Sequence, residues 1–466
     1  MNTLITVKSQ AIKQPKKGFE LTQNHKLALA YLSVAVLPFV LAQLLGMEFT
    51  GLYTSVLSAV NLLAMMVFFI QFPLAGRLKK VPLFSNIDWG ITQHKKLGKY
   101  LGIFFFLHPI FIVLPKALMS ADDLSVSVWS IVTSPHLLTA LIAWCAMAIW
   151  VLMSIYKDRL NLRYETWRLM HVTGFAIIAT LATLHITTIG SHGQFNPRFN
   201  TLWWLLYGLS MTLLIYNYVI KPKLSINQAY SISSIEKITD SDWQLSIQNN
   251  NQTPLVYQAG QFVWINTSGN PYSLEQHPFS IVSATADGQV NFAIRALGDY
   301  TSSLGKLKPE QVVFIDGPYG NMTLAPSQFA SGITLIAGGA GISPMLSLLT
   351  LLAKQQDQRP IRLLYANHNM SRMIYLETLA ELQRTMANFK VQLVCEYIEL
   401  YQTYEQPNIT HGLIQGQDIV DTVTKGQESQ WAYYLCGPAP MISNMRDTLH
   451  RLGVSNNQIH YEQLTF

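Results

Sequence analysis

Residues 93–114 read QHKKLGKYLGIFFFLHPIFIVL, and residues 168–189 read RLMHVTGFAIIATLATLHITTI. Both stretches are apolar, and each carries two histidines 14 positions apart: His94 and His108 in the first, His171 and His185 in the second. Fourteen residues of α-helix rise about 21 Å, most of a hydrocarbon core of about 30 Å. Fourteen steps of about 100° end near a whole number of turns, so the imidazoles of each pair share one helix face.

Two such helices side by side present two imidazoles at each of two membrane depths. Polar groups at these depths are costly and usually functional. We therefore predict two stacked haems, with His94 and His171 as ligands of one iron and His108 and His185 as ligands of the other. The alternative is that each histidine is a hydrogen-bonded polar residue inside a helix bundle.

The composition is that of a membrane protein joined to a soluble one. Half of the 466 residues are hydrophobic and 12% are charged, about half the usual charged share. The apolar excess lies before about residue 221, where we predict six spans: 27–46, 52–74, 97–116, 136–156, 167–189 and 201–220. Three scattered cysteines argue against a disulfide framework and against a cysteine-ligated metal.

The formal charge of +6 indicates how the chain is oriented in the membrane and does not indicate nucleic-acid binding. The reason is that the basic residues cluster in alternate short loops between the spans. The positive-inside rule then predicts a multi-pass protein of the cell (inner) membrane with both termini in the cytoplasm. We expect residues 1–24 to be a cytoplasmic tail and residues 25–223 to be the haem-binding membrane domain. His94 and His171 would lie near the inner face, and Arg77, Lys95, Arg163 and Arg168 could neutralise haem propionates or simply anchor the topology.

The remaining residues read as two soluble domains. Short alternating strands broken by turns predict a small antiparallel β-barrel over residues 224–326. Alternating strands and helices over residues 327–466 predict a doubly wound α/β domain. A buried strand at 333–337 is followed by Gly338-Gly339-Ala340-Gly341 and by a helix that opens at Ile342-Ser343-Pro344. Such a glycine turn lets a pyrophosphate approach the amide groups of a helix N-terminus.

Five motifs of the chain resemble those of the NADPH oxidase and ferric reductase family. They are His277-Pro278-Phe279-Ser280, Arg295 with Gly298-Asp299-Tyr300-Thr301, Gly338 to Pro344, Leu435-Cys436-Gly437-Pro438, and the terminal Phe466. They occur in the family's order behind the two histidine pairs, so the resemblance covers roughly residues 30–466. It implies a transmembrane flavocytochrome b with ferredoxin-reductase-type FAD and NAD(P) domains.

The resemblance also implies roles for these residues. Ser280 would hydrogen-bond the reactive nitrogen of the flavin, Cys436 would lie against the nicotinamide, and Phe466 would cover the flavin ring. The other residues would bind the two nucleotides: for FAD, His277, Pro278, Phe279, Arg295, Gly298 and Thr301; for NAD(P), Gly338, Gly339, Gly341, Ile342, Pro344, Gly437 and Pro438.

One feature departs from the NADP-preferring reductases, which often place Ser-Arg after the strand that corresponds to 390–395. Here the chain reads Cys395-Glu396. A carboxylate accepts hydrogen bonds from a ribose diol but repels a 2′-phosphate. This favours NADH over NADPH, although Arg372 could compensate.

The sequence thus predicts an oxidoreductase that moves electrons from cytoplasmic NAD(P)H through FAD and two b-type haems to an acceptor outside. A ferric chelate is the favoured acceptor, because the chain lacks calcium-binding or other regulatory extensions. The alternatives are dioxygen, which would give a superoxide-generating oxidase, and a periplasmic partner enzyme. A haem-binding sensor or a transporter is a third class, against which the flavin and nucleotide motifs argue.

Overall fold

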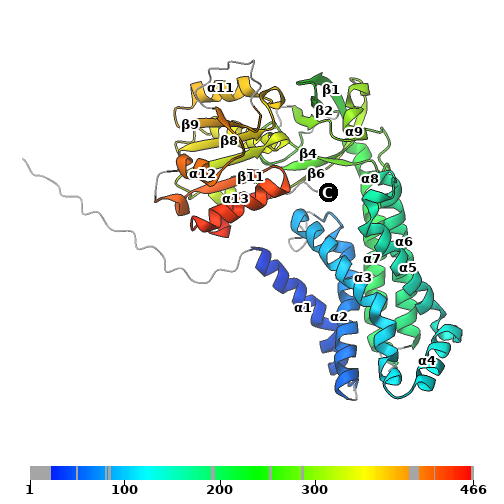
Figure 1. The fold of residues 1–466 in the computed structure, drawn as a ribbon. Helices are drawn as coiled ribbons and strands as arrows, with labels where there is room; N and C mark the ends of the chain where they lie inside the picture. The colour runs from blue at the N-terminus through cyan, green and yellow to red at the C-terminus, as the bar shows by residue number, and fades with distance from the viewer. Residues whose placement is uncertain are drawn as a thin grey trace, which may run out of the picture.

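The computed structural model of the chain describes residues 23–48, 51–78, 81, 86–189, 195–250, 254–284, 288–397, 409–423 and 426–462. Two lobes, one built on a β-sheet and one of alternating strands and helices, lie over one end of a bundle of long helices (Figure 1). Six helices of this described part are long and apolar enough to cross a membrane. Their bounds are α1 Gln23–Leu44, α2 Leu52–Leu74, α3 Ile87–Ala117, α5 Leu138–Ile155, α6 Tyr164–Ile189 and α7 Pro197–Ile215.

The six predicted spans correspond to these six helices, with two differences. Helix α3 begins ten residues before the expected 97, because Asn86 caps it by accepting a hydrogen bond from the Trp89 amide (3.2 Å). A further helix, α4 (Ala121–Thr133), replaces the expected outer loop. Its cap is Ser120, whose hydroxyl accepts from the Asp123 amide (3.0 Å). Its length, 13 residues, is too short for the span criterion that predicted the others.

Small residues let the bundle helices approach each other closely. A Cβ on Gly174 of α6 would overlap the Trp150 indole of α5, and one on Gly102 of α3 would lie 2.5 Å from Val151 of α5. Close packing at small residues is a common way for membrane helices to associate. Helix α5 is therefore fixed against both histidine-bearing helices, α3 and α6.

The first lobe is a six-stranded antiparallel sheet in the order β4-β3-β6-β1-β2-β5. Its strands are β1 Tyr230–Lys237, β2 Asp242–Asn249, β3 Phe262–Asn266, β4 His277–Ser280, β5 Gln289–Arg295 and β6 Val312–Tyr319. The predicted antiparallel β-barrel is not closed, because an isolated bridge, Ile281 to Phe292, joins the two edge strands among the described residues. Strand β4 has four residues, and Pro278 within it has no N–H to donate.

The second lobe confirms the doubly wound prediction. Its parallel sheet has the order β10-β9-β8-β7-β11-β12, with helices on both faces. The strands are β7 Ile333–Gly338, β8 Ile361–Asn367, β9 Phe389–Cys395, β10 Ile409–His411, β11 Ala432–Cys436 and β12 Ile459–Glu462. The helices are α10 Ile342–Lys354, α11 Leu376–Thr385, α12 Gly416–Thr422 and α13 Ala439–Arg451. Four of these elements were not predicted from the sequence: β10, α12, α13 and β12.

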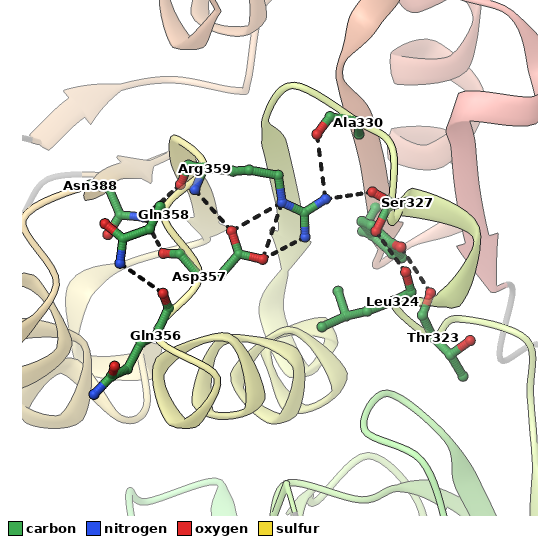
Figure 2. Close-up of polar contacts among 10 residues, drawn as sticks. Thr323, Leu324, Ser327, Ala330, Gln356, Asp357, Gln358, Arg359 and Asn388 are labelled. Carbon is green, nitrogen blue, oxygen red and sulfur yellow. Dashed lines mark hydrogen bonds and ion pairs between the residues drawn. The ribbon is translucent and has the colours of Figure 1, made fainter.

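A hydrogen-bonded junction fastens the connection between the lobes to the second sheet. Arg359, in the turn before β8, pairs with Asp357 (2.6 Å) and donates to the carbonyl of Ser327 (Figure 2). The Tyr434 hydroxyl of β11 donates to the carbonyl of Thr323 (2.8 Å). Residues 323–330 therefore lie against the nucleotide lobe and not free between the two.

Candidate functional site

The structure brings His94 and His171 together at the end of the bundle that faces the lobes. Their ring centroids are 6.0 Å apart. Nδ1 of His94 donates to the carbonyl of Gln71 (3.2 Å). Nδ1 of His171 lies 3.0 Å from the Ser154 hydroxyl, which itself donates to the Trp150 carbonyl and therefore accepts from the ring. Both rings thus carry their proton on Nδ1, and Nε2 is left as a lone-pair donor.

This arrangement fits a bis-imidazole iron. A metal bound to imidazole lies about 2 Å from the nitrogen. Two rings on opposite sides of one iron therefore have centroids about 6 Å apart, close to the observed 6.0 Å. The hydrogen bonds from Nδ1 to Gln71 and Ser154 are the kind of outer contacts that orient a metal-binding histidine.

A cavity of about 510 Å³ surrounds the two rings and reaches the first lobe. This volume lies within the range of cofactor pockets, about 300–1,000 Å³. Its walls are apolar deep in the bundle, at Phe68, Phe175 and Met147, and polar at the lobe end. The polar end gathers the cationic side chains Arg77, Lys95, Lys99, Lys157, Arg168 and Lys221. Such a rim suits a flat apolar group with carboxylates at one edge.

The second histidine pair lies 14 residues further along the same two helices. The His108 ring lies 6.2 Å from the ring of Phe104. Nδ1 of His185 is buried and has no hydrogen-bond partner in the part of the chain that the structure describes. A buried imidazole nitrogen without a partner is costly and calls for a ligand or water. The predicted role of this pair as haem ligands stays a prediction.

A salt-bridge cluster, the Asp316 cluster, joins the first lobe to the bundle beside the cavity. Asp316 of β6 accepts from Lys221 (2.7 Å) and from Arg77 (3.3 Å), and the Tyr319 hydroxyl donates to it (2.6 Å). The Arg77 guanidinium lies 3.6 Å from the centre of the Trp264 ring. Burial acts to raise the pKa of Asp316, but Lys221 and Arg77 overcome this effect and lower it. The carboxylate therefore stays charged at neutral pH.

The flavin motif lies at the edge of the first sheet, over the same end of the bundle. Pro278 and Phe279 pair with β3, and Ser280 is 6% exposed with its Oγ lacking a partner among the described residues. The His277 ring stacks on Tyr300 at 3.8 Å. Burial lowers the pKa of His277, and Glu165 at the start of α6 partly offsets the shift. An orphaned serine hydroxyl at this position fits a hydrogen bond to a flavin nitrogen.

The predicted flavin-phosphate turn uses its polar groups within the protein. The Thr301 hydroxyl accepts from the amides of Leu297 (2.9 Å) and Gly298 (3.0 Å) and so shapes the start of α9 (Asp299–Ser302). Arg295 pairs with the buried Asp242 (2.8 Å) and donates to the carbonyl of Arg372 in the nucleotide lobe (2.9 Å). Arg295 therefore links the two lobes, and its contact with flavin stays a prediction.

The glycine loop of the second lobe packs directly against the turn after β11. A Cβ on Gly341 would lie 2.2 Å from the Cys436 carbonyl, and one on Gly437 would lie 2.5 Å from Met441. Gly339 has a φ of +55°, which glycine adopts without strain. Ile342 and Pro344 are buried. At the start of α10 the Ser343 hydroxyl is buried and has no partner among the described residues, a donor well placed for a phosphate.

Substituting Gly341 by alanine should therefore weaken nucleotide binding. The new methyl group meets a backbone carbonyl, which cannot rotate away as a side chain can. We expect the KM for NADH to rise by about tenfold or more, since overpacking costs about 1–3 kcal/mol. Steady-state kinetics with an artificial dye acceptor measure this, with Gly208→Ala as a control, because Gly208 has open space around it and an ordinary backbone conformation. A KM unchanged in Gly341→Ala would contradict the packing argument.

One of the three predicted hydride-transfer residues, Cys436, is buried in the nucleotide lobe beside an acidic side chain. Cys436 ends β11, is 2% exposed, and pairs in register with Glu462 of β12. Burial, with Glu462 as the next cause, raises the pKa of the Cys436 thiol, so the thiol stays neutral. Glu462 was missed by sequence reasoning, although a lone acid at the end of the short strand Ile459 to Glu462 was a usable signal. Phe466 lies outside the described residues.

Glu396 contacts His368, a partner that the sequence did not suggest. Its carboxylate lies 2.9 Å from Nδ1 of His368, and both side chains are about half exposed. The Tyr397 ring lies 4.6 Å from the His368 ring. These residues follow β8 and β9 at their carboxyl ends, the edge where doubly wound sheets bind ligands.

Three protein-family models match consecutive parts of the chain. Residues 54–183 match the ferric reductase like transmembrane component, residues 229–323 a FAD-binding domain, and residues 335–447 the oxidoreductase NAD-binding domain. The first match includes His94, His108 and His171 and ends two residues before His185. The second and third include the flavin and glycine motifs described above.

Curated relatives match about half of the chain at low identity. The toluate 1,2-dioxygenase electron transfer component of Pseudomonas putida is 24% identical over 50% of this chain and 66% of its own length. The propane 2-monooxygenase reductase component of Mycolicibacterium goodii is 26% identical over 45% of this chain and 59% of its own length. The chain thus spans about two thirds or less of these relatives. A solved flavohemoglobin from Malassezia yamatoensis matches with a TM-score of 0.47 at 18% identity. The match covers 84% of this chain and 98% of the flavohemoglobin chain.

Proposed function

This chain is a ferric reductase-like transmembrane flavoprotein and an NAD(P)H-dependent oxidoreductase, and from that premise we propose that it carries electrons across a membrane. The electrons would pass from NAD(P)H through FAD and two b-type haems to an acceptor on the other side. The observation that carries the proposal is the His94–His171 pair, 6.0 Å apart in a cavity that reaches the flavin lobe.

When bound, FAD and haem supply the redox chemistry, and the protein supplies position and environment. His94 and His171 would hold the iron near the lobes, and His108 and His185 the one farther away. Ser280 would orient the flavin, and the glycine loop with Ser343 would hold the nucleotide phosphates. The Asp316 cluster fixes the flavin lobe over the cavity, because Lys221 and Arg77 come from the bundle and Asp316 from β6.

The lobes would lie in the cytoplasm. The cations Arg77, Lys95, Arg168 and Lys221 all line the lobe end of the cavity, and the positive-inside rule assigns such an end to the cytoplasmic side. His108 and His185 then lie toward the outer face. If each iron is held by two of these imidazoles, no coordination position would stay open, and the acceptor would be reduced by outer-sphere transfer.

A ferric chelate is the acceptor that the family match favours. The test uses proteoliposomes that hold the full chain and a trapped ferric chelate, with NADH added outside. We expect NADH oxidation to reduce the trapped iron only in vesicles whose lobes face outward. Superoxide formed at the rate of NADH loss with no chelate present would instead favour an oxidase. Turnover that requires an added periplasmic protein would favour an electron-donating subunit.

The nucleotide preference provides a separate prediction. We propose that Glu396, held by His368, accepts hydrogen bonds from the adenosine ribose and so favours NADH. Glu396→Arg should shift the ratio of kcat/KM values towards NADPH by about tenfold or more, because a cation replaces a carboxylate beside the 2′ position. Glu377→Arg, a like exchange at the start of α11, serves as the control. An unchanged ratio in Glu396→Arg would place the ribose elsewhere.

A further inference from the structure

Helix α5 holds α6 at the turn that carries His171, and the two helices lie side by side (Figure 1). Trp150 and Ser154 stand one turn apart on α5. Nε1 of Trp150 donates to the carbonyl of Met170, the residue before His171 (2.8 Å). One turn further along α6, Gly174 leaves room for the same indole, which a Cβ there would overlap. Ser154 reaches the His171 ring itself, with its Oγ 3.0 Å from Nδ1.

The His171 ring is held on other sides as well. Trp167 and Phe175, one turn before and one turn after it on α6, have ring centroids 5.1 Å and 4.8 Å from its own. The Ser154 hydroxyl donates its single hydrogen to the Trp150 carbonyl (2.7 Å), so it can only accept from His171. The ring hydrogen therefore sits on Nδ1, and the two hydrogen bonds in series strengthen each other.

The same helix carries a histidine that lacks such an acceptor. His185 lies 14 residues beyond His171, and its Nδ1 is buried without a hydrogen-bond partner among the described residues. Near the lobes, by contrast, His94 also has an acceptor, the Gln71 carbonyl (3.2 Å). An acceptor on the Nδ1 hydrogen raises the basicity of the ring and makes Nε2 a stronger ligand. Stronger donation favours Fe(III) over Fe(II), so an iron held by His94 and His171 is harder to reduce.

We propose that Ser154 is a positioning residue that strengthens His171 as a ligand, so that the haem near the lobes has a lower reduction potential than the farther one. This inference rests on the proposed function. An electron then moves downhill from the level of His94 and His171 to the level of His185. In that step the nearer iron is oxidised from Fe(II) to Fe(III) and the farther iron is reduced from Fe(III) to Fe(II). No proton moves, because the Nδ1 hydrogen stays on His171.

The first test is an anaerobic redox titration of the purified full chain, followed by haem absorbance. In Ser154→Ala the lower of the two midpoint potentials should rise towards the higher one. The equilibrium constant for electron exchange between the haems should fall by about two- to tenfold, the scale of one hydrogen bond. Ser154→Thr keeps a hydroxyl and should restore the wild-type separation. Ser154→Cys, whose thiol is a weak acceptor, should lie between the two.

Ser210→Ala provides the matched control for the titration. It removes another hydroxyl from the bundle interior, one that donates to the Leu206 carbonyl of its own helix (2.8 Å). Both midpoint potentials should keep their wild-type values in this variant. A lower midpoint that stays in place in Ser154→Ala, or that moves equally in Ser210→Ala, would overturn the proposal.

The second test isolates the haem near the lobes. His108→Ala is expected to keep only that haem, and adding Ser154→Ala should raise its single midpoint potential. The g values of its electron paramagnetic resonance spectrum should shift, while the spectrum stays low-spin and bis-imidazole. A change to high-spin haem would show that Ser154 only supports packing, and would overturn its effect on the potential. A protein without bis-imidazole haem would defeat the proposed function itself, whereas two haems with an unmoved lower midpoint would defeat this inference alone.

Discussion

Replacing His94 by alanine is expected to remove one haem from the protein and to stop electron transfer to the far side of the membrane. The Nε2 lone pair of His94, fixed by the hydrogen bond from Nδ1 to Gln71, would be half of the ligand set of that iron. Losing a contact that only orients a ligand costs about 10- to 100-fold in metal affinity. Losing the ligand itself should therefore cost more than about 100-fold.

The measurement is the haem-to-protein ratio of the purified variant, with the rate of chelate reduction in proteoliposomes. His136→Ala provides the matched control, because His136 is exposed outside the bundle. His108→Ala should also lose one haem but keep the reduction of flavin by NADH largely intact. A full complement of two low-spin haems in His94→Ala would show that the iron is held elsewhere.

Replacing Asp316 by alanine is expected to loosen the flavin lobe from the bundle. The substitution leaves Lys221 and Arg77 without their shared anion, and the Arg77 side chain is only 11% exposed. Breaking one partner of a buried ion pair costs about 3–5 kcal/mol. Because electron transfer depends on the distance from flavin to haem, haem reduction by NADH should slow by about 100-fold or more.

Stopped-flow absorbance separates this effect from damage to the lobe itself, since flavin bleaching by NADH should slow far less than haem reduction. Asp240→Ala, in the same lobe, removes an exposed carboxylate that pairs only with Lys237 among the described residues, and should have no effect. The pKa of Asp316 is lowered, so its contribution is present at neutral pH and is lost as pH falls below about 4. Equal slowing of both steps in Asp316→Ala would contradict a docking role.

The sequence predicted most of the architecture because the dominant signals are local. The apolar spans and the strand–helix alternation repeat over many residues, and all six predicted spans correspond to helices. Helix α4 was missed because its 13 residues lie in a loop-length segment with two aspartates at its start. A β-barrel was predicted, but whether the sheet closes depends on how the last residues of β4 meet β5, which no local pattern encodes.

The candidate site residues that the sequence predicts also come from local patterns. The 14-residue spacing from His94 to His108, and from His171 to His185, lies within a single helix in each case. The residues of the glycine loop are consecutive in the chain. The Asp316 cluster joins residues that are far apart in the chain, and the contacts of Glu396 with His368 and of Arg295 with Asp242 are also tertiary. The pKa of Glu462 is raised first by burial and then by the charge of Asp88, which is also far away in the chain. Such groups read as ordinary surface charges until the fold brings them together.

An anaerobic stopped-flow spectrum of the purified full chain with NADH tests the central claim most directly. The account predicts that flavin absorbance bleaches first and that two low-spin, bis-imidazole haems are then reduced, in a ratio of two haems to one flavin. A preparation in which NADH bleaches the flavin while no bis-imidazole haem is present or reduced would contradict it.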